Sequence, residues 1–381
     1  MAMKSSSKRV LVVDDSAFMR QLVSDVVRGS GEFDVVGTAR DGAHALEQIR
    51  LLDPDVVTLD IDMPGADGLQ VLQRIMAECP RPVVMLSAGG SDGGVAATLR
   101  ALELGAVEFV RKPSGTISLD LDDVQEYLLE ALRAAVHMNL ATLRSPSQVP
   151  ATASPGASSA SREPNVAAQT GAAPAIARRV VCIASSTGGP AALTEIIPAL
   201  PAFDEVAVVV AQHMPPGFTR SLAARLDGAS ALTVREAVDG EPVLSGHCYV
   251  APGGQHVRIV MHHGVPTVAL DAGPTVWGVR PAADLLFCST ADTFGALAIG
   301  VVLTGMGCDG AEGITAIRNR GGRAMAQDAQ TSVVDGMPGA ARRRGVDAVA
   351  PLPLIAATIC AWIGDQMVRD VSGIPRSGKA A

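Results

Sequence analysis

Acidic residues directly follow two predicted strands near the start of the chain. Asp14 and Asp15 come after the apolar run Val10–Val13, and Asp60 comes after the run Val56–Leu59. Because the carboxyl ends of parallel strands meet at one edge of a sheet, these carboxylates are expected to converge. Converging carboxylates repel one another and favour a hard divalent cation with oxygen ligands, for which Mg²⁺ is the best candidate.

Ser87 and Lys112 follow two further strands of the same predicted sheet. A carboxylate held beside a metal ion and a lysine can accept a phosphoryl group, because both cations offset the charge on the transferred oxygens. The simpler alternative is that Asp14 and Asp15 only cap the helix that begins near Ser16. Suitable residues at the ends of four of the five predicted strands favour the phosphoryl-acceptor interpretation.

A second group of candidate residues, Ser185–Pro190, lies between a predicted strand and a predicted helix. Pro190 suits the first helical turn, where its missing N–H costs nothing, and the glycines permit a sharp turn. Free backbone N–H groups and the helix dipole favour a developing oxyanion there. The segment resembles a nucleophile elbow in its logic, although G-x-S-x-G is absent. Taken alone, a Ser/Thr N-cap with a glycine turn is the better interpretation.

A histidine and an aspartate follow two other strands of this second region. His213 could act as the base for a serine, because histidine titrates in the useful range. Asp309 could fix the imidazole tautomer and stabilise the imidazolium. Each has a simpler alternative: His213 is one of seven histidines, and an aspartate before a helix is often an N-cap or turn residue. A triad here would have the chain order Ser, His, Asp.

The loop that carries Asp309 also fits a different chemistry. Gly305, Gly307 and Gly310 match the G-x-G-x-x-G dinucleotide fingerprint, and Asp328 stands 18 residues after the last glycine. The motif follows a predicted strand and opens a predicted helix, as a nucleotide site requires. Against it, the motif lies late in its domain and Asp309 would sit close to a pyrophosphate. A hydrolase and a nucleotide-binding or docking domain therefore both stay open at this point.

The elements that must position these residues alternate between strand and helix throughout. The first region has five buried-type strands separated by helices, which predicts a doubly wound parallel sheet. The predicted strands are Val10–Val13, Phe33–Thr38, Val56–Leu59, Val83–Leu86 and Ala106–Val110, and the helices are Ala17–Arg28, Ala43–Leu52 and Val95–Leu104.

The second region predicts another α/β domain, with an antiparallel hairpin inserted around His247–Val260 and Pro266–Leu270. Its other predicted strands are Val180–Ala184, Val206–Ala211, Ala296–Leu303 and Arg323–Gln327, and its helices are Ala191–Ile197, Thr219–Leu226, Ala282–Thr293 and Ala311–Arg320.

Composition excludes several functional classes. The 381 residues include 31 Lys+Arg and 39 Asp+Glu, so the formal net charge is −8, and aromatic residues make up 3%. An acidic chain with few aromatics does not suit nucleic-acid binding as its main task. The longest apolar runs, such as Val206–Ala211, are too short to insert in a membrane, and Met1–Arg9 lacks the apolar core of a secretory signal. The six cysteines are scattered, without a zinc or disulfide pattern. We therefore expect a cytoplasmic protein.

The first region resembles a response-regulator receiver domain. The matching motifs are V-V-D-D-S at Val12–Ser16, L-D-I-D-M-P at Leu59–Pro64, D-G-L at Asp67–Leu69, Ser87, and K-P at Lys112-Pro113. The resemblance implies that Asp60 is the phospho-acceptor and that Asp14, Asp15 and Asp60 serve a Mg²⁺ site, with the backbone carbonyl of Asp62. It also implies that Ser87 and Lys112 sense the phosphoryl group and that Phe109 is the switch aromatic.

The second region resembles the catalytic domain of the CheB family of chemotaxis protein-glutamate methylesterases. The matching motifs are S-S-T-G-G-P at Ser185–Pro190, Q-H-M-P at Gln212–Pro215, A-P-G-G-Q-H at Ala251–His256, R-P-A-A-D-L-L-F at Arg280–Phe287, L-T-G-M-G-C-D-G at Leu303–Gly310, and Q-D-A-Q-T-S-V-V-D-G-M-P at Gln327–Pro338. By this likeness Ser186 is the nucleophile, His213 the base and Asp309 its orienter. Thr187 and the Met306 N–H would lie near the oxyanion. The chain departs from the family at Val279, where many relatives have histidine.

Together the two resemblances imply a domain plan. Residues 8–130 would form the receiver, 131–177 a helix end with a flexible Ala/Ser/Pro linker, and 178–368 the methylesterase domain.

The implied activity is a phosphorylation-activated serine hydrolase of bacterial chemotaxis. It would demethylate glutamate methyl esters on methyl-accepting chemotaxis receptors, releasing methanol, and would deamidate glutamines. A chemotaxis histidine kinase would be the phosphodonor. Mg²⁺ would serve the receiver, and the hydrolytic step would need no cofactor. We expect the unphosphorylated receiver to cover the Ser186 cleft, so that a fragment starting near Arg178 should hydrolyse faster. The alternative is a non-enzymatic signalling protein with a receiver and a nucleotide-binding or docking domain.

Overall fold

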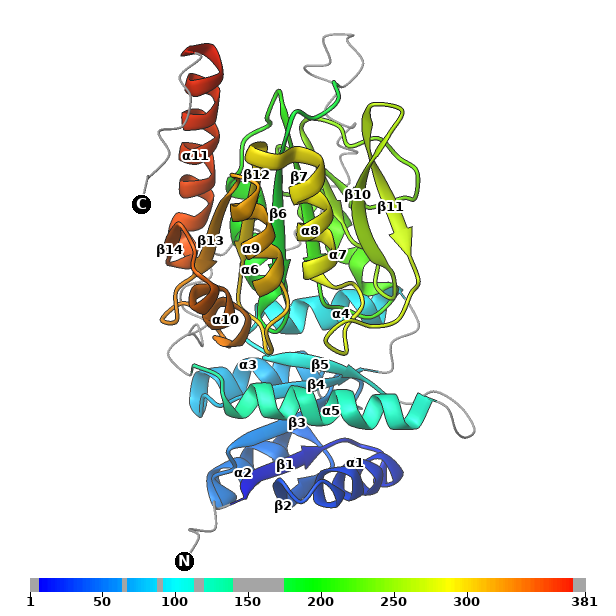
Figure 1. Cartoon of the computed structure of the whole chain (residues 1–381). Helices are drawn as coiled ribbons and strands as arrows, with labels where there is room; N and C mark the ends of the chain where they lie inside the picture. Colours follow the sequence, from blue (N-terminus) through cyan, green and yellow to red (C-terminus); the bar gives the residue numbers. More distant parts are fainter. Residues whose placement is uncertain (1–6, 64–66, 88–91, 113–119, 140–174, 373–381) are drawn as a thin grey trace, which may run out of the picture.

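The computed structural model describes residues 7–63, 67–87, 92–112, 120–139 and 175–372. Figure 1 shows two α/β units stacked on each other, with the N-terminal unit in blue to cyan and the C-terminal unit in green to red. Pro64 and Pro113, which belong to two of the sequence motifs, lie outside the described residues. The expected α/β fold class is confirmed in both units.

The N-terminal unit has a five-stranded sheet in the order β2-β1-β3-β4-β5, and every pair in it is parallel. Its strands are β1 (Lys8–Val13), β2 (Phe33–Ala39), β3 (Val56–Asp60), β4 (Val83–Ser87) and β5 (Glu108–Arg111). Its helices are α1 (Ala17–Gly29), α2 (Gly42–Leu52), α3 (Gly68–Glu78), α4 (Asp92–Glu103) and α5 (Asp120–Val136). Successive β1 residues pack on opposite faces of the sheet, as a strand buried on both sides requires.

The helix α3 was not predicted from the sequence, and for α5 only a helix end beyond residue 130 was predicted. The helix α3 begins immediately after a cluster of turn residues, and Asp67 caps it by accepting a hydrogen bond from the Leu69 N–H at 3.0 Å. The turn residues Met63–Gly65 and the start of the helix lie next to each other in the sequence, so Asp67 is not distinguished from a turn residue by the sequence alone. The helix α5 buries Leu128, Ala131 and Leu132 against the sheet. Both helices complete the two layers that cover a doubly wound sheet.

The C-terminal unit has a seven-stranded sheet in the order β14-β13-β12-β6-β7-β9-β8, in which every recorded pair is parallel. Its strands are β6 (Arg179–Ser185), β7 (Val206–Gln212), β8 (Thr233–Glu236), β9 (His247–Val250), β12 (Ala298–Val302), β13 (Arg323–Gln327) and β14 (Ala348–Ala350). Its helices are α6 (Gly189–Ile196), α7 (Phe218–Asp227), α8 (Ala283–Phe294), α9 (Ala311–Asn319), α10 (Gly336–Arg344) and α11 (Leu352–Ser372).

One prediction for this sheet was wrong in part. His247–Val250 does not belong to an antiparallel hairpin but forms β9, which lies between β7 and β8 and is parallel to both. The hairpin consists of β10 (His256–His262) and β11 (Val265–Asp271), which pair antiparallel in a separate two-stranded sheet. The strand β9 has only four residues, and it is buried because it lies between two other strands. Its own sequence therefore does not indicate which strands it pairs with. The elements β8, α10, β14 and α11 were not predicted.

The centre of the seven-stranded sheet positions the candidate residues. The strands β12, β6 and β7 are adjacent, parallel and fully buried. Their carboxyl ends, at Val302, Ser185 and Gln212, therefore lie at the same edge of the sheet. Each leads into a loop and then a helix, which is where ligands bind in sheets of this kind.

The two units contact each other through defined elements. The helix α4 packs against α6 and α7, and in Figure 1 it lies between the first sheet and the second unit. The rings of Phe109 and Phe218 have centroids 4.4 Å apart, and Glu103 forms an ion pair with Arg225. Beyond α5, the Asn139 N–H donates to the Val333 carbonyl at 3.0 Å. The first unit therefore contacts α6, α7 and the segment after β13 of the second unit.

No helix among the described residues is long and apolar enough to cross a membrane.

Candidate active site and acidic cluster

The candidate nucleophile lies on a tight turn between β6 and α6. The Ser186 N–H donates to the Thr304 carbonyl at 3.0 Å, which ties this turn to the loop after β12. Gly188 has φ +76° and is the N-cap of α6, with no side-chain cap. A Cβ at Gly188 would lie 2.7 Å from the Val333 side chain, so the turn needs glycine for both reasons. The alternative of a Ser/Thr N-cap is therefore wrong.

The strand pairing places His213 beside this turn. Ser185 and Gln212 are the last paired residues of β6 and β7, and the His213 N–H donates to the Ser185 carbonyl at 3.0 Å. Ser186 and His213 thus follow directly from paired residues at the same sheet edge. The His213 side chain is 9% exposed.

Asp309 binds the imidazole of His213, with 2.8 Å between Nε2 and Oδ2. The same carboxylate accepts the N–H groups of Ala283 at 2.6 Å and Asp284 at 2.9 Å, at the first turn of α8. It also accepts the N–H of Gly310 at 2.9 Å. Burial raises the pKa of Asp309, but the hydrogen bond and charge of His213 and the N–H groups of Ala283 and Asp284 outweigh it and hold the pKa below its usual value.

Asp309 is not the N-cap of the helix that follows it. The N-cap of α9 is Gly310, and the Asp309 carboxylate instead lies at the N-terminus of α8, where the helix dipole stabilises an anion. A buried anion on Nε2 favours the tautomer that carries its proton there. Nδ1 is then the nitrogen left to accept a proton.

The loop after β12 approaches the serine turn very closely. A Cβ at Gly305 would lie 2.7 Å from the Ser186 Cβ, so a side chain there would displace the serine. Met306, the next residue, is 37% exposed. The glycine motif therefore allows the backbone of this loop to approach Ser186 closely. This favours the interpretation as a hydrolase over the interpretation as a dinucleotide site.

Thr187 is buried between this loop and the N-terminal unit. Its carbonyl accepts the Thr304 hydroxyl at 3.0 Å, and its own side chain is hydrogen bonded to the carboxyl of Glu108 in β5. Burial raises the pKa of Glu108 to about 7, against smaller opposing effects of the Phe109 N–H and of Thr187. Glu130 of α5 lies within electrostatic range of His213. The N-terminal unit thus brings two carboxyl groups to the candidate active site.

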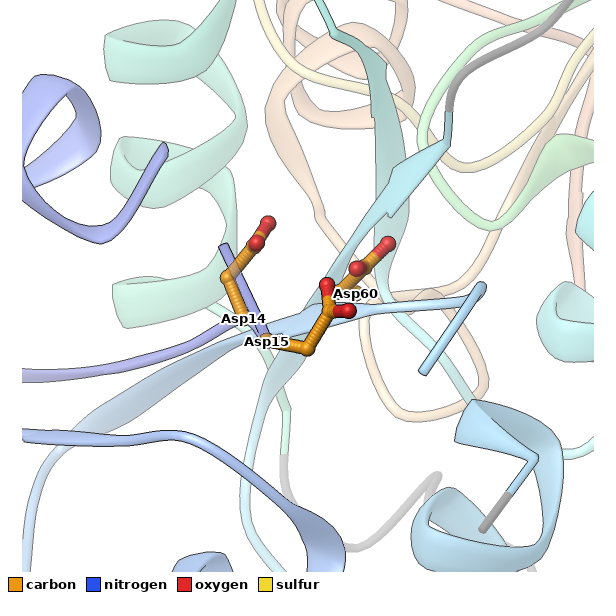
Figure 2. Close-up of side chains that lie close together, drawn as sticks. All are labelled: Asp14, Asp15 and Asp60. Atoms are coloured by element: carbon orange, nitrogen blue, oxygen red, sulfur yellow. The ribbon is translucent and has the colours of Figure 1, made fainter. Parts of the chain in front are cut away.

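In the N-terminal unit, Asp14, Asp15 and Asp60 form one cluster (Figure 2). Carboxylate oxygens of the three lie within 4.8 Å of one another. The ammonium of Lys112 lies 2.8 Å from Asp14 Oδ2 and 2.7 Å from Asp60 Oδ1. Asp60 Oδ2 is buried without a hydrogen-bond partner among the described residues. An oxygen-rich cluster with such an atom suits a divalent cation with oxygen ligands.

The charges in this cluster depend on one another. Burial raises the pKa of Asp60 to about 6, although the hydrogen bond and charge of Lys112 oppose this. Burial opposes the charge of Lys112, but the two carboxylates outweigh it and raise its pKa. Ser87, which is 1% exposed, accepts the Thr98 hydroxyl at 3.0 Å. The Lys112 ammonium is therefore held between the carboxylates of Asp14 and Asp60.

The remaining sequence-predicted residues have other surroundings. The Asp62 carboxylate is not part of the cluster, and its N–H donates to Asp60 Oδ1 at 3.1 Å. Phe109 is buried, with its ring on Phe218. The N-cap of α1 is Ser16, whose own N–H donates to Asp14 Oδ1 at 2.9 Å. Asp14 therefore supports the start of α1 in addition to joining the cluster.

Two functional candidates were missed by sequence reasoning. Gln212 lies beside His213, and only its place in the Q-H-M-P motif could have drawn attention to it. Glu108 is the first residue of β5, and nothing in the sequence indicates that it reaches Thr187 on the other unit.

Two family models match the chain. Residues 181–359 match the CheB methylesterase model, and residues 10–121 match the response regulator receiver domain model.

Similar proteins cover nearly the whole chain. A protein-glutamate methylesterase/protein-glutamine glutaminase of Symbiobacterium thermophilum is 48% identical over 94% of this chain and 97% of its own length. A protein of the same description from Geobacillus kaustophilus is 44% identical over 94% of this chain and 99% of its own length. The crystal structure of the Thermotoga maritima CheB methylesterase catalytic domain is 43% identical and covers 48% of this chain and 98% of that chain, with a TM-score of 0.47.

Proposed function

The chain belongs to the CheB methylesterase family, and from this we propose that it is a phosphorylation-activated protein-glutamate methylesterase and protein-glutamine glutaminase. Its substrates would be methyl esters of glutamate side chains on methyl-accepting chemotaxis receptors, and glutamine side chains of the same proteins. The observation that carries the proposal is the His213–Asp309 contact at the sheet edge where the Ser186 turn also lies.

The proposed mechanism is nucleophilic catalysis by a serine–histidine–aspartate triad. Ser186 Oγ attacks the ester carbonyl while Nδ1 of His213 takes the hydroxyl proton, because Nε2 is bound to Asp309. Thr187 and the Met306 N–H stabilise the oxyanion. His213 then gives the proton to the departing methanol. Water attacks the acyl-enzyme by the same proton relay and releases glutamate. With a glutamine substrate the departing group is ammonia.

Regulation is proposed to occur through the acidic cluster. Asp60 would accept a phosphoryl group from a chemotaxis histidine kinase, and Asp14, Asp15 and the Asp62 carbonyl would hold Mg²⁺ with it. The metal would neutralise charge on the transferred oxygens. Lys112 and Ser87 would then contact the phosphoryl group, and Phe109 would respond to that change. The hydrolytic step uses no cofactor.

The proposed domain plan assigns 8–130 to the receiver, 131–177 to a helix end and linker, and 178–368 to the methylesterase domain. The structure adds detail at the edges: α5 continues to Val136, and the Ala177 N–H already donates to Val243 of the second unit at 2.9 Å. The proposed location is the cytoplasm, where the kinase and the methylated receptor segments would be reached. Nucleic acid and membrane insertion are not part of the proposal.

Release of methanol from methylated receptor membranes tests the proposed function. The full-length protein should release methanol faster when a small phosphodonor and Mg²⁺ are present. Asp60→Asn should retain the basal rate and lose the whole response, because it removes the phospho-acceptor and a carboxylate of the cluster. Conversion of receptor glutamine to glutamate, read by mass spectrometry, tests the second activity.

Asp62→Asn is the matched control for this experiment. Its side chain lies two residues from Asp60 but outside the cluster, so the response to phosphodonor should persist. Absence of methanol with every methylated receptor, or an unchanged response in Asp60→Asn, would contradict the proposal.

The closed arrangement of the two units should depend on pH through Glu108. The pKa of Glu108 is about 7 when the two units are in contact, and it should return towards 4.5 when they separate. The closed arrangement, in which the units are in contact, therefore keeps a proton on Glu108 that the separated units release. Closure is therefore strongest below pH 4.5 and weakens as the pH rises to about 7. The rate of the full-length protein relative to a fragment starting at Arg178 should be below one at low pH. It should rise on the order of tenfold between pH 5.5 and 8.

Dividing by the fragment rate removes the pH dependence that the hydrolytic reaction and the receptor have in the fragment itself. Glu108→Gln keeps the shape of the side chain and cannot titrate, so its rate ratio should not vary with pH. An equal rate for fragment and resting full-length protein would show that the receiver does not inhibit. If the ratio of the full-length rate to the fragment rate does not change with pH in the wild type, Glu108 does not contribute to the inhibition.

A further inference from the structure

Gln212 is the last residue of β7, and its side chain contacts both strands of the candidate active site. Only 1% of the residue is exposed. Its Nε2 donates to the Ser186 carbonyl at 3.0 Å and to the His213 carbonyl at 2.9 Å. Its Oε1 accepts the Ser185 hydroxyl at 2.7 Å. One buried amide thus binds the main chain of two proposed catalytic residues that are far apart in the sequence.

These bonds begin where the strand pairing stops. The ladder between β6 and β7 ends at the pair Ser185–Gln212, and the last backbone bond is from the His213 N–H to the Ser185 carbonyl. Beyond it, no backbone hydrogen bond among the described residues joins Ser186 to His213. The Gln212 side chain extends the hydrogen-bonded connection between the two segments to the residue after each strand, Ser186 and His213.

The surrounding sequence leaves room for this amide. A Cβ at Gly189 would lie 2.1 Å from Gln212 Oε1, so only glycine fits at the first position of α6. The Gly189 N–H also donates to the Ser186 carbonyl at 2.7 Å, which gives that oxygen two donors. Both N–H groups and the oxygen of the amide have partners, so its burial is not penalised.

We propose that Gln212 is a positioning residue for the hydrolytic reaction. By holding the Ser186 and His213 carbonyls with one NH₂ group, it fixes the separation of the serine turn from the end of β7. The side chain touches neither substrate nor reacting atoms in this role. The identity of the reaction in this proposal rests on the proposed function. The hydrogen bonds of Gln212 to the Ser186 and His213 carbonyls are independent of it.

The first experiment compares two glutamine-to-methionine substitutions in full-length protein with Mg²⁺ and phosphodonor. Methionine nearly preserves the side-chain volume and removes all three hydrogen bonds. For Gln212→Met we expect kcat to fall about 100-fold with KM changed less than about threefold, because a shift of about 1 Å at the reacting groups has an effect of that size. Orphaned carbonyls should also lower the Tm.

Gln366→Met is the matched control. Gln366 is buried in α11 and donates to the Ala296 carbonyl at 3.1 Å, remote from the serine turn. It should leave kcat unchanged and lower the Tm less than Gln212→Met does, because it removes one hydrogen bond and an Oε1 that has no hydrogen-bond partner among the described residues. The proposal is overturned if Gln212→Met keeps kcat, or if Gln366→Met loses as much activity at a similar loss of Tm.

Two more variants separate the ends of the amide. Gln212→Glu keeps an acceptor for Ser185 but cannot donate to both carbonyls, so it should lose about as much kcat as the methionine variant. It also serves as the test if Gln212→Met does not fold. Ser185→Ala removes only the bond to Oε1 and should cost far less. The reverse order of these two effects would overturn the proposal.

A readout that needs no receptor separates this proposal from the proposed function. In ¹⁵N spectra of the histidine rings, wild-type His213 should show one tautomer, with its proton on Nε2 towards Asp309. Gln212→Met should broaden or shift this signal, and Gln366→Met should leave it unchanged. An unaltered His213 signal in Gln212→Met would overturn the positioning role. Absence of methanol release from the wild type would instead count against the proposed function alone.

Discussion

Replacing Ser186 with alanine is expected to lower the rate of methanol release by about 10⁴-fold or more, because loss of the nucleophile leaves only the oxyanion groups and binding. The substitution removes one hydroxyl from a turn whose backbone bonds do not involve it. The Ser186 N–H to Thr304 and the Ser186 carbonyl to Gly189 should both persist. The Tm should therefore stay close to that of the wild type while kcat collapses.

The neighbouring serine provides the control for this result. Ser185 is fully buried, and its hydroxyl donates to Gln212 Oε1, so it is not available for attack. Ser186 is partly exposed and one residue further into the turn. Ser185→Ala should retain most of the activity. If Ser186→Ala still turns over at a rate near the wild type, or if Ser185→Ala is the inactive variant, the assignment of the nucleophile is wrong.

The response of Ser186→Ala to phosphodonor provides a second check. Its acidic cluster lies in the other unit and is untouched, so Asp60 should still be phosphorylated with Mg²⁺ present. A variant that takes the phosphoryl group and releases no methanol would separate the two chemistries within one folded chain.

The strand β5 connects these two chemistries in space. Lys112, directly after β5, lies against Asp14 and Asp60, whereas Glu108 and Phe109 at its start contact Thr187 and Phe218. A phosphoryl group on Asp60 would draw Lys112 from its present carboxylate contacts. The strand has four residues, so its two sets of contacts lie close together. The proposed phospho-acceptor site and the contacts to Thr187 and Phe218 are therefore joined by one short strand.

The sequence predicted the positions of the candidate site residues better than their contacts. Asp14, Asp60, Ser186 and His213 each lie at or directly after the end of a buried strand. Parallel strands bring such positions to one edge of a sheet whatever the details of packing. The α/β class and the edge location could therefore be predicted from apolar runs alone. His213 and Asp309 meet because α8 presents its N-terminus to Asp309, which no local pattern encodes.

The parts that were missed have a common physical cause. The sequence around β9 predicts a hairpin because the segments that follow it, β10 and β11, also have strand-forming residues. The strands that β9 pairs with, β7 and β8, are set by the arrangement of the whole sheet. Glu108 and Gln212 are polar residues in strands, and their roles come from what lies opposite them after folding. The sequence shows that these two residues are polar, but it does not indicate which groups they contact.

Replacing Asp309 with asparagine is expected to lower kcat by about 10³- to 10⁴-fold, because the imidazole loses both its tautomer preference and the charge that stabilises the imidazolium. The carboxylate accepts from His213, Ala283, Asp284 and Gly310. Each oxygen accepts from two of these donors, so the NH₂ group of asparagine must face either His213 and Ala283 or Asp284 and Gly310. The variant should therefore also lose Tm, since the first turn of α8 is left with unpaired N–H groups.

Asp284→Asn distinguishes the catalytic loss from the structural one. Asp284 is also a buried acid at the N-terminus of α8, but its carboxylate accepts from the Gly313 N–H and the Trp277 Nε1, both at 2.8 Å, and not from His213. We expect this variant to lose Tm and to keep kcat within about tenfold, because packing near the site is disturbed while the His213 tautomer is kept. Equal losses of kcat in the two variants would mean that Asp309 acts only by anchoring α8. A much larger loss in Asp309→Asn, with the ¹⁵N signal of the His213 ring changed only there, would mean that the carboxylate acts on the imidazole itself.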